Sequence, residues 1–416
     1  MQTGSNSLQA RLLRRISESI GAAPIQLVLG NERFCPPNVN PVATVTIRDR
    51  QTLAGLIVDP EVAFGEAYSD GRIRVEGDLV RFLEAVYHSM ANAPAARSWY
   101  SRLASNSMQL WQHNSLRGSR HNIHQHYDLG NEFYKLWLDR ALVYTCAYFP
   151  SPSTTLEAAQ SAKMDYVCRK LRLQPGETVV EAGCGWGALA LHMARNYGVS
   201  VKAFNVSREQ IAYARQRARE EGLDGQVEFI EDDYRNLSGK FDVFVSVGML
   251  EHVGIEHYRE LGNIIYRSIS DSGRGFLHFL GRSHPAPLSR WIRKRIFPGA
   301  FIPTLRQALT VLEPWSFSVQ DVENLRWHYA KTMEHWLERF EKSQRQVETM
   351  YDSRFVRMWR LYLAGSLAAF RTGTLQLFQV VFTGSRCRPI SCTRDHLYAP
   401  PATGPIEHET WTPAMS

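Results

Sequence analysis

The 416-residue sequence contains no run of about 18 uncharged apolar residues, so we expect no transmembrane helix. Its first residues lack an apolar stretch followed by a small-residue cleavage site, which predicts no secretory signal peptide. The six cysteines are scattered and lack the spacing of zinc ligands, and a disulfide framework is not expected in so long a chain. We therefore predict no metal site and a cytoplasmic location.

An excess of acidic residues is also absent, because the formal net charge is +7. A basic balance favours anionic partners, either nucleic acid or an anionic lipid surface, although ordinary basic enzymes share it. The sequence contains no nucleic-acid-binding signature. We therefore expect a membrane surface rather than nucleic acid as the partner.

A glycine-rich stretch at 179–189, VVEAGCGWGAL, is the strongest local signal. It has the pattern of a buried strand, a tight turn through Gly183, Gly185 and Gly187, and the N-terminus of a helix. Glycines let backbone N–H groups approach a ligand, and a helix N-terminus attracts negative charge. The spacing alone also fits a dinucleotide site or a purely structural turn. Glu181 favours S-adenosylmethionine (SAM), because its carboxylate can reach an amino-acid ammonium.

Strand and helix patterns alternate through the middle of the chain. We expect strands at 178–182, 199–205, 227–231, 241–247 and 275–280, with helices at 156–171, 188–196, 208–221 and 257–269 between or before them. This alternation predicts an α/β fold with a doubly wound parallel sheet, in which ligands bind beyond the carboxyl ends of the strands. A long helical region at 329–370 and a final strand at 376–382 follow.

The flanking regions have a different character. Residues 1–93 predict a small α+β domain, whose first 20 residues form a basic amphipathic helix that either packs on the domain or lies on lipid. Residues 94–120 predict a helical linker, and 386–416 a polar, proline-containing tail that is disordered or loosely packed. The segment 289–303 mixes basic and aromatic residues, which indicates either a phospholipid-facing lid or a solvated helix.

Six motifs occur in the following order between residues 121 and 385: HYDLGNEFYKLWLD, YTCAYF, EAGCGWG, DDYRNL, SVGMLEHVG and FRTGTLQLFQVVF. On these motifs the region resembles the catalytic domain of cyclopropane-fatty-acyl-phospholipid synthases, relatives of the mycolic acid cyclopropane synthases. The stretch FGEAYSDG resembles the N-terminal domain of the longer bacterial synthases. The resemblance implies a class I, Rossmann-like SAM-methyltransferase domain with a smaller lipid-associated domain. It also implies an enzyme that binds peripherally to the inner membrane face, as a possible homodimer.

The resemblance also implies a set of SAM-binding residues. Thr145 replaces the serine of a Tyr-Ser pair and keeps the hydroxyl, and Asn205-Val206 departs from the usual Thr-Leu. Gln210 matches the family's glutamine and can bond ribose hydroxyls through its amide. The full set is Tyr144, Thr145, Glu181, Gly183, Gly185, Asn205, Val206, Gln210, Asp233, Tyr234 and Arg235, of which the last three match the family's adenine site.

A second implied set holds a bicarbonate ion. It comprises Cys146, Glu251, His278 and Tyr329, together with a backbone group of Leu280. Each side chain alone also has an ordinary explanation, such as a buried apolar cysteine or a satisfied core histidine. Their joint occurrence at matching motifs favours the ion site.

The chemistry explains why a base is needed. Methyl transfer from the SAM sulfonium to a cis alkene leaves a carbocation, and ring closure then requires loss of a proton from the new methyl group. Aromatic side chains at Tyr127, Phe133, Tyr144 and Tyr148 are expected to stabilise the cation through their π faces. We therefore expect a SAM-dependent synthase that forms cyclopropane rings on unsaturated phospholipid acyl chains. The alternatives are a relative giving methylene- or methyl-branched products, and a lipid-binding protein that retains SAM only structurally.

Overall fold

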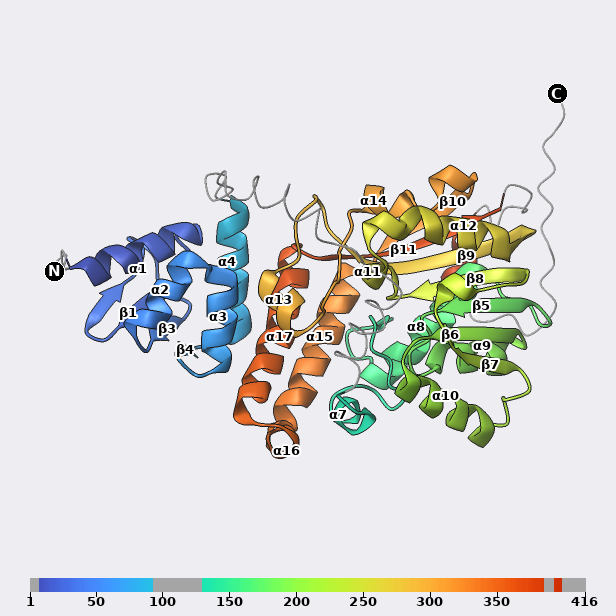
Figure 1. Cartoon of the computed structure of the whole chain (residues 1–416), viewed down its shortest axis with the longest axis horizontal. Helices are drawn as coiled ribbons and strands as arrows, with labels where there is room; N and C mark the ends of the chain where they lie inside the picture. The colour runs from blue at the N-terminus through green and yellow to red at the C-terminus, as the bar shows by residue number, and fades with distance from the viewer. Residues whose placement is uncertain (1–6, 93–128, 385–392, 399–416) are drawn as a thin grey trace, which may run out of the picture.

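The computed structural model describes residues 7–92, 129–384 and 393–398, so the linker predicted at 94–120 lies outside the described residues. Figure 1 shows the N-terminal unit at one end of the molecule and the large sheet at the other. Two long helices, α15 (Arg326–Lys342) and α17 (Ser353–Thr372), stand between them. Within the described ranges, no helix combines the length and the apolar character that crossing a membrane requires.

The N-terminal unit is a four-stranded sheet with the order β2-β1-β3-β4, accompanied by helices. Strands β1 and β3 are parallel, and the other neighbouring pairs are antiparallel. This is the α+β composition that the sequence predicts. The elements are α1 (Leu8–Ser19), β1 (Gln26–Leu29), β2 (Glu32–Phe34), β3 (Thr44–Ile47), α2 (Arg50–Val58), α3 (Pro60–Ser69), β4 (Ile73–Glu76) and α4 (Leu79–Asn92).

The first helix packs on the N-terminal unit through one face. Leu13 and Ile16 are buried, whereas Arg11, Arg14 and Arg15 are exposed. The apolar spacing therefore serves packing, and the basic residues remain on the outer surface of the molecule.

The large sheet has seven strands in the order β10-β11-β9-β8-β5-β6-β7. Five neighbours, from β9 to β7, are parallel, as predicted. The final strand predicted at 376–382 joins this sheet as β11, and it is antiparallel to both β9 and β10. The strands are β5 (Thr178–Ala182), β6 (Ser200–Asn205), β7 (Val227–Glu231), β8 (Phe241–Val247), β9 (Ile269–Gly281), β10 (Ser318–Asn324) and β11 (Gln376–Thr383).

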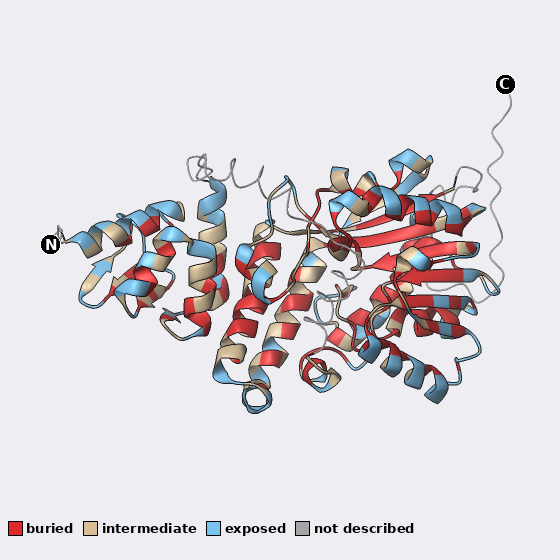
Figure 2. Cartoon of the chain, viewed as in Figure 1, coloured by how far each residue is buried: buried red, intermediate tan, exposed pale blue. Residues whose placement is uncertain are grey.

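Helices cover both faces of this sheet, and their buried sides meet its apolar strands (Figure 2). The α/β class with a doubly wound architecture is therefore confirmed. The remaining helices are α7 (Asn131–Lys135), α8 (Leu156–Leu171), α9 (Ala188–Tyr197), α10 (Arg208–Glu220), α11 (Leu250–Val253), α12 (Tyr258–Ser268), α13 (Arg290–Arg295), α14 (Leu305–Leu309), α16 (Gln344–Met350) and α18 (Asp395–Tyr398).

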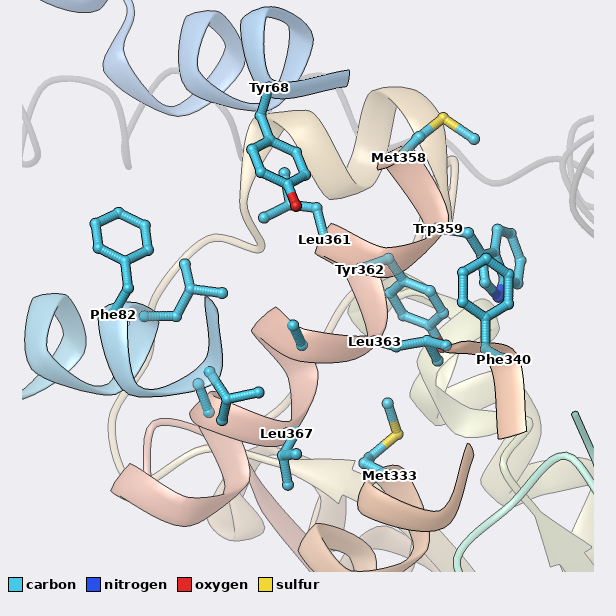
Figure 3. Close-up of a cluster of buried hydrophobic side chains, with 14 of the residues drawn as sticks. Tyr68, Phe82, Met333, Phe340, Met358, Trp359, Leu361, Tyr362, Leu363 and Leu367 are labelled. Atoms are coloured by element: carbon cyan, nitrogen blue, oxygen red, sulfur yellow. The ribbon is translucent and has the colours of Figure 1, made fainter. Parts of the chain in front are cut away.

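One apolar core joins the N-terminal unit to α15 and α17. Figure 3 shows Tyr68 and Phe82 of the N-terminal unit in the same cluster as Leu361 and Leu367 of α17. Close approach of helices adds to this contact, because a Cβ at Gly65 on α3 would lie 2.4 Å from the indole ring of Trp291 on α13. A side chain at this position would therefore push the two helices apart.

Ion pairs also connect the N-terminal unit to α13 and α17. Glu66 on α3 is 2.6 Å from Arg295 Nε and 2.7 Å from Arg354 Nη2, and Asp59 is 2.9 Å from Arg290 Nη1. The segment 289–303 therefore holds the two parts of the chain together, and its interpretation as a solvated helix is wrong. Arg290, Lys294 and Arg295 of this segment pair with the carboxylates of Asp59 and Glu66.

Part of the C-terminal tail is also packed. Leu397 is buried, and α18 lies against α8. Arg394 forms an ion pair with Asp321 of β10. These described residues are ordered against the sheet domain rather than loosely attached.

Candidate active site

A continuous cavity of about 930 Å³ extends from the carboxyl ends of the sheet strands, along α15 and α17, into the N-terminal unit. This volume is near the upper end of the range for ligand pockets. Glycines and polar side chains line the sheet end, and aliphatic and aromatic side chains line the rest. The cavity can therefore hold a polar cofactor and a long apolar substrate together.

The glycine turn after β5 opens onto this cavity. Gly183, Gly185 and Gly187 have φ angles of +85°, +54° and +80°, which side chains rarely adopt. A Cβ at Gly185 would meet no protein atom within 4 Å, whereas one at Gly187 would lie 2.5 Å from Phe229. Gly187 therefore allows close packing, and Gly185 keeps open the space that a ligand would fill.

The polar residues after β6 form a small network beside the turn. Asn205 Nδ2 donates to the backbone oxygen of Gly185 at 3.2 Å and to Gln210 Oε1 at 2.7 Å. Val206, the residue after Asn205, lines the cavity, and Ser207 is the N-cap residue of α10. The amide of Gln210 faces the cavity beside the glycine turn, as the ribose assignment requires.

The residues predicted for the adenine lie at the next strand end. Asp233 Oδ1 accepts from Arg235 Nε at 2.8 Å, and Oδ2 accepts from Nη2 at 2.9 Å. Together with Tyr234, both residues line the cavity. This bidentate ion pair fixes the loop after β7 at the end of the cavity where SAM is expected to bind.

A buried lysine that sequence reasoning missed lies between the predicted groups. Lys163 Nζ donates to Thr145 Oγ1 at 3.1 Å and interacts electrostatically with Glu181. Burial lowers the pKa of Lys163 to about 8 and raises that of Glu181 to about 7, while the lysine opposes the latter change. Because the buried face of the 156–171 helix also carries Gln160 and Lys170, the apolar periodicity did not single out Lys163.

Two further residues complete this part of the wall. Tyr144 shares a hydrogen bond of 2.7 Å with the hydroxyl of Tyr362 on α17, which the sequence did not single out. The second carboxylate oxygen of Glu181 is buried and has no hydrogen-bond partner among the described residues. An unpaired buried carboxylate oxygen on the cavity wall fits the ammonium of an amino-acid ligand.

Glu251 and His278 both line the cavity. The backbone N–H of Leu280 donates to Glu251 Oε1 at 2.5 Å, and the amide of Gln379 donates to His278 Nδ1 at 3.1 Å. Glu251 Oε2 and His278 Nε2 are buried and have no partner among the described residues. Burial raises the pKa of Glu251 to about 7 and lowers that of His278 far below its ordinary range.

The other predicted base-site residues have different positions. Tyr329 lines the cavity and stacks on Phe370, with ring centroids 4.5 Å apart. Cys146 is fully buried, and its thiol donates to the backbone oxygen of Ala147 rather than facing the cavity. The backbone N–H of Leu280 is already bonded to Glu251. Neither Cys146 Sγ nor this N–H is therefore available to a ligand in this structure.

Of the aromatic residues expected near the cation, Tyr144 lines the cavity. Phe133 is buried in an aromatic cluster with Trp137 and Trp359, and Tyr148 stacks on Tyr166, so neither lines the cavity. Tyr127 lies outside the described residues. Other rings that line the cavity include those of Trp186, Tyr329, Tyr362 and Phe370.

Comparison with known proteins assigns the family. The family model of mycolic acid cyclopropane synthetase matches residues 114–380. The chain belongs to this family. A second model, a domain of unknown function (DUF7884), matches residues 30–95.

Individual relatives agree with the assignment. A probable fatty acid methyltransferase of Pseudomonas putida is 34% identical over 86% of this chain and 91% of its own length. The cyclopropane-fatty-acyl-phospholipid synthase of Escherichia coli (strain K12) is 41% identical over 62% of this chain and 66% of its own. The mycolic acid cyclopropane synthase CmaA1, solved with SAH and CTAB, has a TM-score of 0.61 and 29% identity over 64% of this chain and 98% of its own.

This member of the family is a SAM-dependent methyltransferase. The geometry fits the cofactor, because the open glycine turn and the unpaired Glu181 oxygen lie side by side on one wall. Asn205 and Gln210 follow on the same wall, and Asp233, Tyr234 and Arg235 close its far end.

Proposed function

We propose that the enzyme transfers a methylene group from SAM to the cis double bond of unsaturated phospholipid acyl chains, which forms a cyclopropane ring. The observation that carries this proposal is that Glu251 and His278 both line the cavity, while Glu251 Oε2 and His278 Nε2 are buried without a partner among the described residues. A base site at this point serves the removal of a proton from a newly attached methyl group.

Both groups suit a bound bicarbonate ion. Since Gln379 donates to His278 Nδ1, the neutral imidazole carries its proton on Nε2 and can donate to an anion. With a pKa near 7, Glu251 is available in its protonated form, which donates a hydrogen bond and adds no second negative charge. Bicarbonate bound there would accept the proton that ring closure releases.

The remaining cavity suits the intermediate. SAM supplies a methyl group whose transfer to one alkene carbon leaves a positive charge on the other. The rings of Tyr144, Tyr329 and Phe370 present π faces or edges in an enclosed space, where attraction between ring and cation is strong. The apolar wall excludes water that would otherwise capture the cation.

A phospholipid substrate at a membrane surface fits the outer features of the molecule. The cavity is long and mostly apolar, and Arg11, Arg14 and Arg15 form an exposed basic face on α1. Basic residues near an anionic bilayer contribute about 1 kcal/mol each. The enzyme would then work as a peripheral protein that draws acyl chains out of the bilayer.

A second candidate function is formation of a methyl- or methylene-branched chain from the same cation. It is favoured by the Pseudomonas putida relative, a probable fatty acid methyltransferase, which matches a larger share of this chain than the Escherichia coli synthase does. A hydride shift followed by proton loss gives a methylene branch, which also needs a base.

One experiment separates these products. The enzyme is incubated with labelled SAM and vesicles of an unsaturated phospholipid, and the acyl products are analysed by mass spectrometry and NMR. Cyclopropane ring protons support the proposal, whereas olefinic methylene protons support the alternative. NMR is required because the ring and the methylene branch have the same mass. Absence of labelled acyl product would contradict both.

A further inference from the structure

The cavity continues beyond the active site into the N-terminal unit. There it is bounded by buried aliphatic and aromatic side chains on the inner faces of β1 and β3 and on α2 and α4. They are Ile25, Leu27, Val45, Ile47, Leu56, Phe82 and Leu83. This branch has no polar group suited to SAM chemistry, so the reaction itself does not explain it.

Small residues on α17 connect this branch to the active site. Gly365, Ser366 and Ala369 line the cavity on the side of α17 that faces α4. A Cβ at Gly365 would lie 3.7 Å from the hydroxyl of Tyr87 on α4. Larger side chains here would fill the passage between the two helices.

A partly buried cation, Arg282, stands at this passage and interacts electrostatically with Tyr87 of α4. Arg282 follows β9, and its backbone N–H donates to Pro303 O at 2.9 Å, which fixes its position. Its Nε is buried without a partner, and no hydrogen bond from its guanidinium reaches any described residue. Glu61 interacts electrostatically with Arg282, but Glu61 Oε2 accepts a hydrogen bond from the backbone N–H of Arg290 at 2.9 Å.

We propose that a diacyl phospholipid binds with its phosphate at Arg282 and its second, unreacted acyl chain in the branch within the N-terminal unit. The unsaturated chain then extends along α17 to Glu251. An unpaired guanidinium fits a phosphate, because its rigid N–H donors match the phosphate oxygens. A cavity with apolar lining both in the N-terminal unit and along α17, and with Arg282 also on its wall, fits two acyl chains joined at a phosphate. The inference rests on the proposed function, since it names how that substrate binds.

Three lipids that share one oleoyl chain test this arrangement in identical micelles of uncharged detergent. The first is phosphatidylglycerol with one palmitoyl and one oleoyl chain. The second is the diacylglycerol with the same two chains, and the third is lysophosphatidylglycerol with the oleoyl chain only. Transfer of label from SAM gives kcat/KM for each. Arg282→Gln should lower the ratio of phospholipid to diacylglycerol about tenfold, the effect of one lost charge-assisted hydrogen bond. An unchanged ratio would overturn the phosphate site.

The branch is tested by filling it. Leu83→Trp should lower the ratio of diacyl to lysophospholipid about tenfold, and the milder Leu27→Phe should lower it in the same direction. Val58→Trp, at a position that is 86% exposed and away from the cavity, is the matched control and should leave the ratio unchanged. Equal ratios in all variants would overturn the second-chain site.

A binding readout does not depend on these variants. Phosphatidylglycerol with a diazirine on its palmitoyl chain should crosslink to peptides from residues 25–91 of the wild-type enzyme. Crosslinks confined to the sheet domain would contradict the proposal. If none of the three lipids is a substrate, the proposed function fails, whereas turnover without these ratio changes contradicts only the present inference.

Discussion

Leu280 holds Glu251 by a hydrogen bond from its backbone N–H to Oε1 at 2.5 Å, while Oε2 is buried and has no partner among the described residues. A strand backbone is a rigid donor, so the carboxyl group is fixed by β9 rather than by a mobile side chain. The unpaired oxygen is the feature on which the proposed base site depends.

The first prediction concerns this carboxyl group. Glu251→Gln keeps an acceptor for Leu280 but replaces the acid hydroxyl that would donate to bicarbonate with a weaker amide donor, so kcat should fall about tenfold, as for loss of a hydrogen bond to a charged group. The SAM dissociation constant, measured by calorimetry, should stay within about twofold. Glu348→Gln, an exposed carboxylate on α16, is the control and should retain full activity. Undiminished turnover of Glu251→Gln would exclude this residue from the reaction.

The second prediction is a pH dependence of stability. Burial raises the pKa of Glu251 from 4.5 to about 7. Between these values the folded chain keeps a proton that the unfolded chain has released, so the free energy of unfolding falls as pH rises through this window. Glu251→Gln lacks this titration and should gain roughly 2–3 kcal/mol over wild type between about pH 5 and pH 8. Urea unfolding at both pH values measures the difference, and a pH-independent difference would argue against a perturbed Glu251.

The third prediction concerns Lys163. Lys163→Met removes the donor to Thr145 and the charge near Glu181, so SAM should bind about tenfold more weakly, as expected for one charge-assisted hydrogen bond. Lys342→Met, on the exposed end of α15, is the control. Calorimetric titration with SAM measures both variants, and equal affinities would show that Lys163 serves only the fold.

The fourth prediction separates backbone strain from ligand contact at the glycine turn. Gly185→Ala and Gly222→Ala both place a Cβ at positive φ, +54° and +67°, with no protein atom within 4 Å. Each should lose about 1 kcal/mol of stability. Only Gly185→Ala should also weaken SAM binding, by tenfold or more, because its methyl group projects into the SAM-binding space. Equal SAM affinities in the two variants would contradict the placement of SAM.

The fifth prediction concerns the junction. Glu66→Gln breaks contacts to Arg295 and Arg354, so the N-terminal unit should separate more easily, at a cost of about 2 kcal/mol. Hydrogen exchange in α3 and α13 should increase, while exchange in β5 stays as in wild type. Unaltered exchange in α3 and α13 would show that the apolar core alone holds the junction.

The sequence by itself determined the local elements with strong periodicity. Helix 156–171 and strands 178–182, 227–231 and 241–247 have the predicted bounds, because their apolar residues repeat with the period of their structure. Strand β10 was missed, since SVQDVEN is a polar, largely exposed edge strand with little apolar alternation. The glycine turn together with the carboxylate of Glu181 likewise favoured SAM, although the glycine spacing alone also fitted a dinucleotide site.

Tertiary structure decided which side chains share a space. The antiparallel course of β11 follows from the return of the chain through α17, and it brings Gln379 beside His278. The burial of Lys163 and the unpaired guanidinium of Arg282 depend on elements distant in sequence, as does the withdrawal of Cys146 from the cavity. Periodicity reports which face of an element is buried, but the partner of that face is set by packing between elements. The sequence thus identified the glycine turn expected to bind SAM. Only the tertiary structure showed that this turn opens onto an apolar cavity that reaches the N-terminal unit.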